Sequence, residues 1–219
     1  MKLTISEENH IKCIYHLQQG TGLVNTNSLA VELQTKAASV TDMLKKLKTK
    51  KIIQYEKYKG FKLTEMGKKI ALSIIRKHRL WEYFLTVKLG FDWAKVHAIA
   101  EELEHISNEE LIQKLDDFLG NPSFDPHGDP IPDSMGKIPT IKQYSILQLP
   151  LKKKAVVSSV SNQSAEMLAM LKHYKISIGS AIQIIQQFSF DNSIEIKVDK
   201  NAATIISEHV AKNIFVYYE

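Results

Sequence analysis

Residues 25–63 read NTNSLAVELQTKAASVTDMLKKLKTKKIIQYEKYKGFKL, and this stretch decides the fold. Polar side chains open it and can cap a helix, whereas the isoleucines and aromatic residues of its second half favour strands. The stretch predicts two helices joined by a brief turn and then a two-stranded hairpin, at 25–33, 36–49, 52–55 and 61–63. A helix-turn-helix followed by a small hairpin indicates a winged helix.

The second of these helices has one apolar stripe, formed by Val40, Leu44 and Leu47, so its polar N-terminal end is left for another partner. In this motif the N-terminal residues of the second helix enter the major groove, and lysines beside them follow the phosphate backbone. A solvated lysine-rich surface is the alternative. We predict that DNA is contacted by Lys36, Ala38, Ser39, Thr41, Lys46 and, on the hairpin, Lys57 and Lys59.

The charge of the chain supports two binding sites of opposite sign. Residues 1–80 carry 16 Lys and Arg against 6 Asp and Glu, whereas residues 81–135 carry 3 against 12. A basic segment favours a polyanion because neutralising phosphates releases counterions, and an acidic segment favours cations. We therefore expect double-stranded DNA at the first segment and a cation at the second.

Around the winged helix the chain is mainly helical until a linker rich in proline. Helices are predicted at 6–19, from Thr64 to about residue 89, from Asp92 to about 106, and from a capping box at 107–110 to residue 119. Short apolar runs beyond the linker indicate a small β-barrel. The predicted domains are a winged-helix DNA-binding domain, a helical metal-binding and dimerisation domain, a linker and an SH3-like barrel, at 1–64, 65–120, 121–149 and 150–219.

Histidines and carboxylates repeat at helical spacing in the acidic segment. One predicted helix places four of them at i, i+4, i+7 and i+8, and the preceding long helix carries two more at i, i+4. Ion pairs on the helix surface are the alternative. Imidazole and carboxylate without thiolate suit Mn²⁺ or Fe²⁺. The candidate ligands are His78, Glu82, His97, Glu101, Glu104 and His105.

Other classes of protein lack support in the sequence. There is no HExxH motif and no glycine-rich phosphate loop, so we do not expect an enzyme. The single cysteine, Cys13, rules out an internal disulfide and suits a reducing compartment. No long apolar run and no signal peptide are present, so we expect a cytoplasmic protein without a membrane partner.

Over nearly its whole length the chain resembles the diphtheria toxin repressor family of iron- and manganese-dependent repressors. The segments that carry the resemblance are 76–82 (RKHRLWE), 95–105 (KVHAIAEELEH), 55–60 (YEKYKG) and 126–132 (PHGDPIP). The resemblance implies a homodimer whose winged helices bind operator DNA when divalent metal orders them. It also implies a C-terminal SH3-like domain of the FeoA type.

The resemblance also implies two metal sites, with His78, Glu82 and His97 in one and Glu101, Glu104 and His105 in the other. Manganese-type members commonly have glutamate where this chain has Glu101, so the chain leans toward manganese. This sequence departs from the family on the first helix, where Asn9 replaces a methionine or aspartate ligand and Lys12 replaces a glutamate of some members. Asp125 is a further candidate ligand, next to the position of a ligand cysteine in related members.

The sequence thus predicts a repressor of metal-homeostasis genes with Mn²⁺ or Fe²⁺ as corepressor. Two other functions stay open. A winged-helix regulator could respond to a small organic ligand while its acidic helices are merely solvated, and DNA binding would then ignore metal. A metal-binding protein without DNA affinity could use the barrel to contact other proteins.

Overall fold

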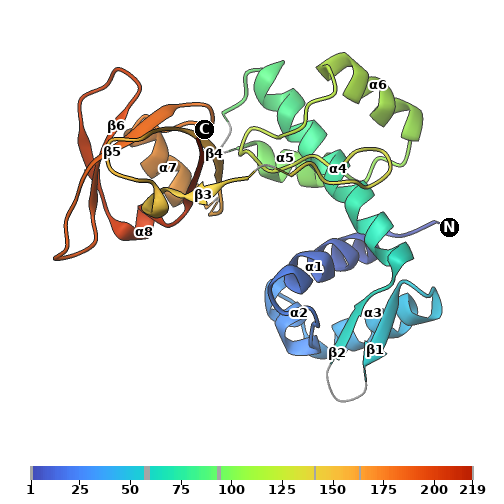
Figure 1. Ribbon diagram of the computed structural model, residues 1–219. Coiled ribbons are helices and arrows are strands. Elements are labelled where there is room, and N and C mark those ends of the chain that lie inside the picture. The colour runs from blue at the N-terminus through green and yellow to red at the C-terminus, as the bar shows by residue number, and fades with distance from the viewer. Residues whose placement is uncertain (1, 57–59, 93–94, 141, 163, 219) are drawn as a thin grey trace.

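The computed structural model describes residues 2–56, 60–92, 95–140, 142–162 and 164–218 (Figure 1). The chain forms an N-terminal winged helix, a central layer of helices and a C-terminal sheet. The fold class is the one predicted from the sequence. No helix in the described ranges combines the length and apolar character that crossing a bilayer requires.

The winged helix is built on a buried apolar core. Its elements are α1 (Ile5–Thr21), α2 (Thr26–Glu32), α3 (Ala37–Thr49), β1 (Ile53–Glu56) and β2 (Gly60–Leu63). Thr4 caps α1, because its side chain and that of Glu7 each bond the backbone of the other. Val24 pairs with Phe61 in an isolated antiparallel bridge beside the two-stranded hairpin. A Cβ at Gly60 would stand 2.4 Å from the carbonyl oxygen of Val24, so this contact requires glycine.

The central layer consists of α4 (Glu65–Val87), α5 (Val96–Leu103) and α6 (Glu109–Leu119). Leu80 of α4 packs against Ile112, Leu115 and Leu119 of α6 in a second core. The first turns of α4 reach back into the winged helix, where Ala71 is buried. One helix therefore takes part in both cores (Figure 1).

The helix that carries the predicted ligands is shorter than the sequence indicated. It begins at Val96, after a turn in which the amide of Lys95 donates to the carbonyl of Asp92, and it ends at Leu103 instead of near residue 106. Glu104 is the C-cap residue and His105 lies beyond it. Glu104 keeps helical backbone angles and its amide donates to the carbonyl of Ala100, so of the four predicted ligands only His105 lies beyond the helix.

The C-terminal region is a six-stranded antiparallel sheet with its own core. The strand order is β3-β8-β4-β5-β6-β7, and β3 lies within the segment 121–149 predicted as linker. The elements are β3 (Tyr144–Ser145), the 3-10 helix η1 (Ile146–Gln148), β4 (Lys154–Val160), α7 (Ala165–His173), β5 (Ala181–Gln187), β6 (Ile194–Val198), β7 (Thr204–Ile206), α8 (Glu208–Ala211) and β8 (Ile214–Tyr217).

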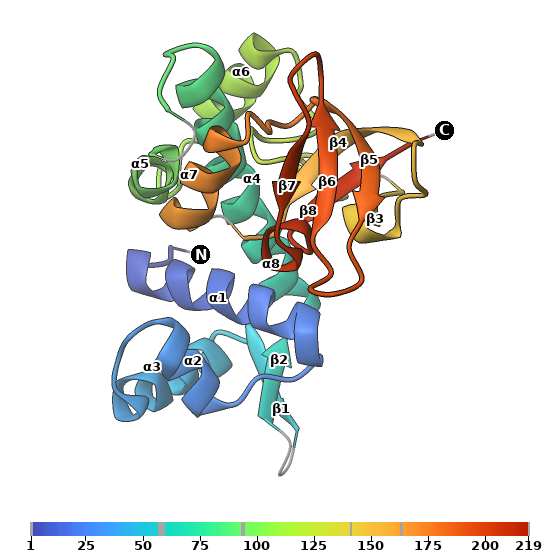
Figure 2. The same ribbon diagram turned by 90° about the vertical axis from the view of Figure 1, so that its left-hand side faces the viewer.

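The sheet docks on the central layer through the loop at 124–130 (Figure 2). The amide of Val160 donates to the carbonyl of His127 across 3.2 Å. A Cβ at Gly128, whose φ is +83°, would stand 1.8 Å from the carbonyl oxygen of Ser158. The backbone of this loop thus packs directly against the backbone of β4. The same loop also borders the candidate functional site.

Candidate functional site

Three of the predicted ligands meet where α4 passes α5. His78 and Glu82 lie one turn apart on α4, and His97 lies in the first turn of α5. His78 Nε2 is 3.0 Å from Glu82 Oε1 and 3.1 Å from His97 Nδ1, and His97 Nδ1 is 3.2 Å from Glu82 Oε1. The His78 and Glu82 side chains are buried, whereas that of His97 is 58% exposed. The three donor atoms form a small triangle open to solvent at the side of α5.

The donor types of this triangle suit Mn²⁺ or Fe²⁺. Two imidazoles and one carboxylate on one face are the donor set of ferrous sites, and manganese accepts nitrogen and oxygen ligands in octahedral geometry. The three donor atoms lie 3.0 to 3.2 Å apart, close enough for one ion to contact all of them.

The second nitrogen of His78 is held by a carboxylate. His78 Nδ1 is 2.6 Å from Glu104 Oε2, and this contact leaves Nε2 directed at Glu82 and His97. Burial opposes protonation of the ring, but the hydrogen bonds to Glu104 and Glu82 outweigh it and raise the pKa of His78 to about 9. A carboxylate partner of this kind fixes the orientation of a metal-ligating imidazole.

The raised pKa of His78 predicts a pH dependence for the metal-free protein. Protonated His78 stabilises the folded state fully below its unfolded pKa of about 6.5, and this contribution is lost as the pH rises through about 9. In EDTA, the free energy of unfolding by urea should fall by about 3 kcal/mol across that range. The variant His78→Gln should flatten the curve, and His173→Gln, at an exposed site on α7, should not. Equal slopes in all three proteins would refute this assignment.

The other three predicted helix ligands do not form a comparable cluster. The Glu101 side chain is 52% exposed and its Oε1 lies 3.5 Å from His97 Nε2. The Glu104 side chain is fully buried and binds the ammonium of Lys12 on α1, with Nζ 2.7 Å from Oε1. His105 turns to α1 as well, where its Nδ1 is 2.6 Å from Glu8 Oε2. Each of the three has a protein partner.

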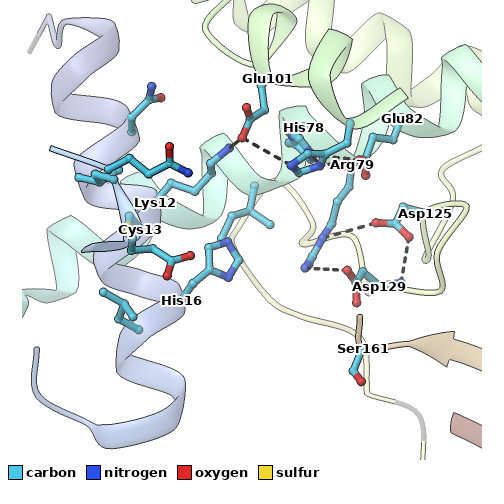
Figure 3. A pocket seen from close by; sticks show the side chains of 17 residues that line it. Lys12, Cys13, His16, His78, Arg79, Glu82, Glu101, Asp125, Asp129 and Ser161 are labelled. Carbon is cyan, nitrogen blue, oxygen red and sulfur yellow. Dashed lines mark hydrogen bonds and ion pairs between the residues drawn. The ribbon is translucent and has the colours of Figure 1, made fainter. Parts of the chain in front are cut away.

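The triangle opens into a pocket of about 850 Å³ between α1, α4 and the loop at 124–130 (Figure 3). Of the predicted ligands, Asn9, Glu101 and Asp125 line this pocket together with the triangle, whereas Glu104 and His105 do not. The carboxylate of Asp125 is turned partly inward, because its Oδ1 accepts from the amides of His127 and Asp129. Burial, reinforced by the neighbouring carboxylates of Asp129 and Glu82, raises the pKa of Asp125.

Reasoning from the sequence missed several residues at this site. His127 is buried, and its Nε2 lies 3.8 Å from Glu82 Oε1. Arg79 stands one residue after His78, and its guanidinium approaches Asp125 and Asp129 at 3.7 Å each (Figure 3). The motif 126–132, one of the segments that carry the family resemblance, was the one signal in the sequence for residues of this loop. The spacing of its residues does not predict that the loop packs against α4.

The predicted DNA surface is solvent-exposed where the structure describes it. The side chains of Val40, Leu44 and Leu47 are buried, and the predicted contacts Lys36, Ala38, Ser39, Thr41 and Lys46 are exposed. The hydroxyl of Thr41 donates to the carbonyl of Ala37 across 2.9 Å, so its methyl group and oxygen lone pairs remain for a partner. Lys57 and Lys59 lie outside the described residues, between the two strands of the hairpin.

Family models match three consecutive parts of the chain. They are the N-terminal DNA binding domain of iron dependent repressors at 2–61, the metal binding and dimerisation domain of these repressors at 64–133, and the FeoA domain at 144–218.

Individual proteins match as well. The HTH-type transcriptional regulator MntR of Oceanobacillus iheyensis is 34% identical over 116 residues, which are 53% of this chain and 78% of that protein. The iron-dependent repressor IdeR of Mycobacterium tuberculosis is 29% identical over 131 residues, 60% of this chain and 57% of IdeR, so the match spans little more than half of that relative. A manganese-dependent transcriptional repressor in complex with manganese has a TM-score of 0.82 at 29% identity, covering 96% of this chain and 98% of that one.

Proposed function

Because the chain belongs to the iron-dependent repressor family, we propose that it represses transcription by binding operator DNA as a homodimer when Mn²⁺ or Fe²⁺ is bound. The observation that carries the proposal is the triangle of His78, Glu82 and His97 beside the first helix of a winged helix. We propose a binding role for the triangle and no catalytic one. Operator DNA as the partner implies that the protein acts in the cytoplasm.

We further propose the domain limits 1–64, 65–120, 121–149 and 150–219, with dimerisation through the second domain. Residues 64–133 match a domain described as metal binding and dimerisation. Several large apolar side chains of this region are exposed, namely Val87, Leu89, Phe91, Leu111 and Phe118. We assign these side chains to the contact with a second copy, because the matched domain is described as a dimerisation domain.

The residues of this chain connect the triangle to the DNA-binding helix. A divalent ion bound at the triangle would supply a cross-link between α4 and α5. His78 Nδ1 pairs with the carboxylate of Glu104, and this carboxylate accepts a hydrogen bond from the ammonium of Lys12 on α1. Ile11 and Ile14 of α1 are buried in the core that also contains Leu44 and Leu47 of α3. A change in the position of α5 relative to α4 is therefore transmitted through α1 to α3. Metal shifts the equilibrium between the arrangement that binds DNA and the one that does not, because its affinity for the DNA-competent arrangement is higher.

The test is fluorescence anisotropy of a labelled palindromic fragment from the manganese or iron uptake promoter of the source organism. The protein is titrated in EDTA, Mn²⁺, anaerobic Fe²⁺ and Zn²⁺. Tight binding only with Mn²⁺ or Fe²⁺ is expected, and the stronger of the two identifies the corepressor. Equal binding in EDTA would favour a regulator of another kind, and metal binding without DNA affinity would favour a metal-binding protein of different function.

The DNA surface predicts a salt effect for Lys46. Its exposed side chain lies in the last turn of α3, away from the N-terminal end that enters the groove, and there it would neutralise one phosphate. Lys46→Ala should weaken binding to all DNA sequences and lower the slope of log affinity against log salt concentration by about one. The control is Lys114→Ala on α6, which should leave both unchanged. An unaltered slope in the Lys46 variant would exclude a phosphate contact at this residue.

A further inference from the structure

Lys12 reaches from α1 into the carboxylates at the end of α5. Its Nζ lies 2.7 Å from Glu104 Oε1 and 2.8 Å from Glu104 Oε2. It also lies 3.6 Å from Glu101 Oε1 (Figure 3). The Lys12 side chain is 16% exposed, and that of Glu104 is fully buried. Both oxygens of one carboxylate thus face a single ammonium, in an arrangement that differs from a solvated surface ion pair.

The ammonium stands among three residues predicted to hold a metal ion. His105 Nε2 lies 3.8 Å from the same Glu104 oxygen that Lys12 approaches at 2.7 Å. Glu101 contributes a second carboxylate, 3.6 Å from Nζ. The buried carboxylate of Glu104 has two partners within the chain, since His78 pairs with its Oε2 and Lys12 brings a positive charge to its Oε1. A divalent ion placed between Glu101 and Glu104 would be repelled by the Lys12 ammonium.

The same region has a second link to α1 that uses no ion. His105 Nδ1 is 2.6 Å from Glu8 Oε2, one turn before Lys12 on α1. Two side-chain pairs therefore join α1 to the end of α5. Lys12 lines the same pocket as the triangle of His78, Glu82 and His97, and Glu104 lies behind the triangle, where it pairs with His78 Nδ1.

We propose that Lys12 is a built-in cation that replaces a metal ion between Glu101 and Glu104, so that each subunit binds one divalent ion, at the triangle. This inference rests on the proposed function, which supplies the divalent ion. What it adds is the number of ions that each subunit binds and where they bind. It assigns Glu101, Glu104 and His105 to a metal-independent link between α1 and α5. Lys12 is a positioning residue that holds α1 in its docked place before metal arrives.

The experiment counts Mn²⁺ per subunit by elemental analysis after equilibrium dialysis of the full chain. Wild type should retain one ion. Lys12→Gln, which removes the charge, should retain two, and Lys12→Met should do the same if the glutamine variant does not fold. Lys12→Arg, which keeps the charge, should retain one, as should Lys114→Gln on α6. Two ions in wild type, or one ion in both uncharged variants, would overturn the proposal.

Glu82→Gln separates this proposal from the proposed function. With Lys12 in place, the Glu82 variant should retain no Mn²⁺. If it retains one ion, that ion lies outside the triangle, and Lys12 does not exclude metal from the place between Glu101 and Glu104. The proposal on Lys12 would then fail, even if operator binding stays metal-dependent. A wild-type protein that retains no ion would overturn both proposals, and the titration of operator DNA would then also show no effect of metal.

Hydrogen exchange of the metal-free protein provides a readout that is independent of DNA and metal. Amides of α1 should exchange at least about tenfold faster in Lys12→Gln than in wild type, because the link to buried Glu104 is lost. Lys12→Arg should restore most of the protection. Equal protection of α1 in wild type and both variants would show that Lys12 does not hold the helix.

Discussion

Replacing Glu82 with glutamine should abolish metal-dependent operator binding. Glu82 Oε1 lies 3.0 and 3.2 Å from the two imidazole nitrogens of the triangle, and its side chain is buried. An amide keeps the size of the side chain but removes the negative charge that a divalent ion requires. Loss of an outer-shell partner alone typically costs 10- to 100-fold in affinity, so loss of this ligand should lower Mn²⁺ affinity at least about 100-fold.

The measurement is isothermal titration of Mn²⁺ together with anisotropy of the labelled operator. Binding by the Glu82 variant in Mn²⁺ should fall to the wild-type level in EDTA, while its circular dichroism stays unchanged. The matched control is Glu102→Gln, an exposed glutamate on α5 that should behave as wild type. Tight, manganese-dependent operator binding by the Glu82 variant would remove the triangle as the metal site.

Adding one methyl group at Gly128 should detach the C-terminal sheet from the central layer. The new Cβ would stand 1.8 Å from the carbonyl oxygen of Ser158, which is backbone and cannot rotate away. The residue also has a φ of +83°, which disfavours alanine by about 1–2 kcal/mol before any clash. Because the loop at 124–130 lines the pocket, Mn²⁺ affinity should decrease together with docking.

Gly179→Ala provides the control for Gly128→Ala. Gly179 has a similar φ of +86°, but a Cβ there meets nothing within 4 Å, so this variant carries the backbone strain without the clash. Small-angle scattering should give a larger radius of gyration for the Gly128 variant only. A compact Gly128 variant with wild-type Mn²⁺ affinity would show that the loop relaxes without undocking.

The winged helix and the triangle were predictable because their signals are local. Capping residues, one apolar stripe and a hairpin after it specify a winged helix within 39 residues. The i, i+4 spacing of His78 and Glu82 places both on one face of α4, and the short connection to α5 brings His97 near them. Neither inference required a contact between distant parts of the chain.

The rest of the site depends on contacts that spacing does not encode. Helix α5 ends at Leu103, so that His105 lies beyond it, and nothing in the sequence marked that end clearly. The place of Lys12 depends on α1 packing beside α5, 92 residues away. The sequence showed only that Lys12 replaces a glutamate of some family members, whereas the folded chain makes it the partner of a buried carboxylate.

The shared helix α4 has a consequence for how the molecule unfolds. Because Ala71 belongs to the core of the winged helix and Leu80 to that of the central layer, neither core can melt without loosening the same helix. The first 119 residues should consequently lose their structure in one cooperative step. The C-terminal sheet has a separate core and is joined to them mainly by loop contacts, so it can open and close as an independent folding unit.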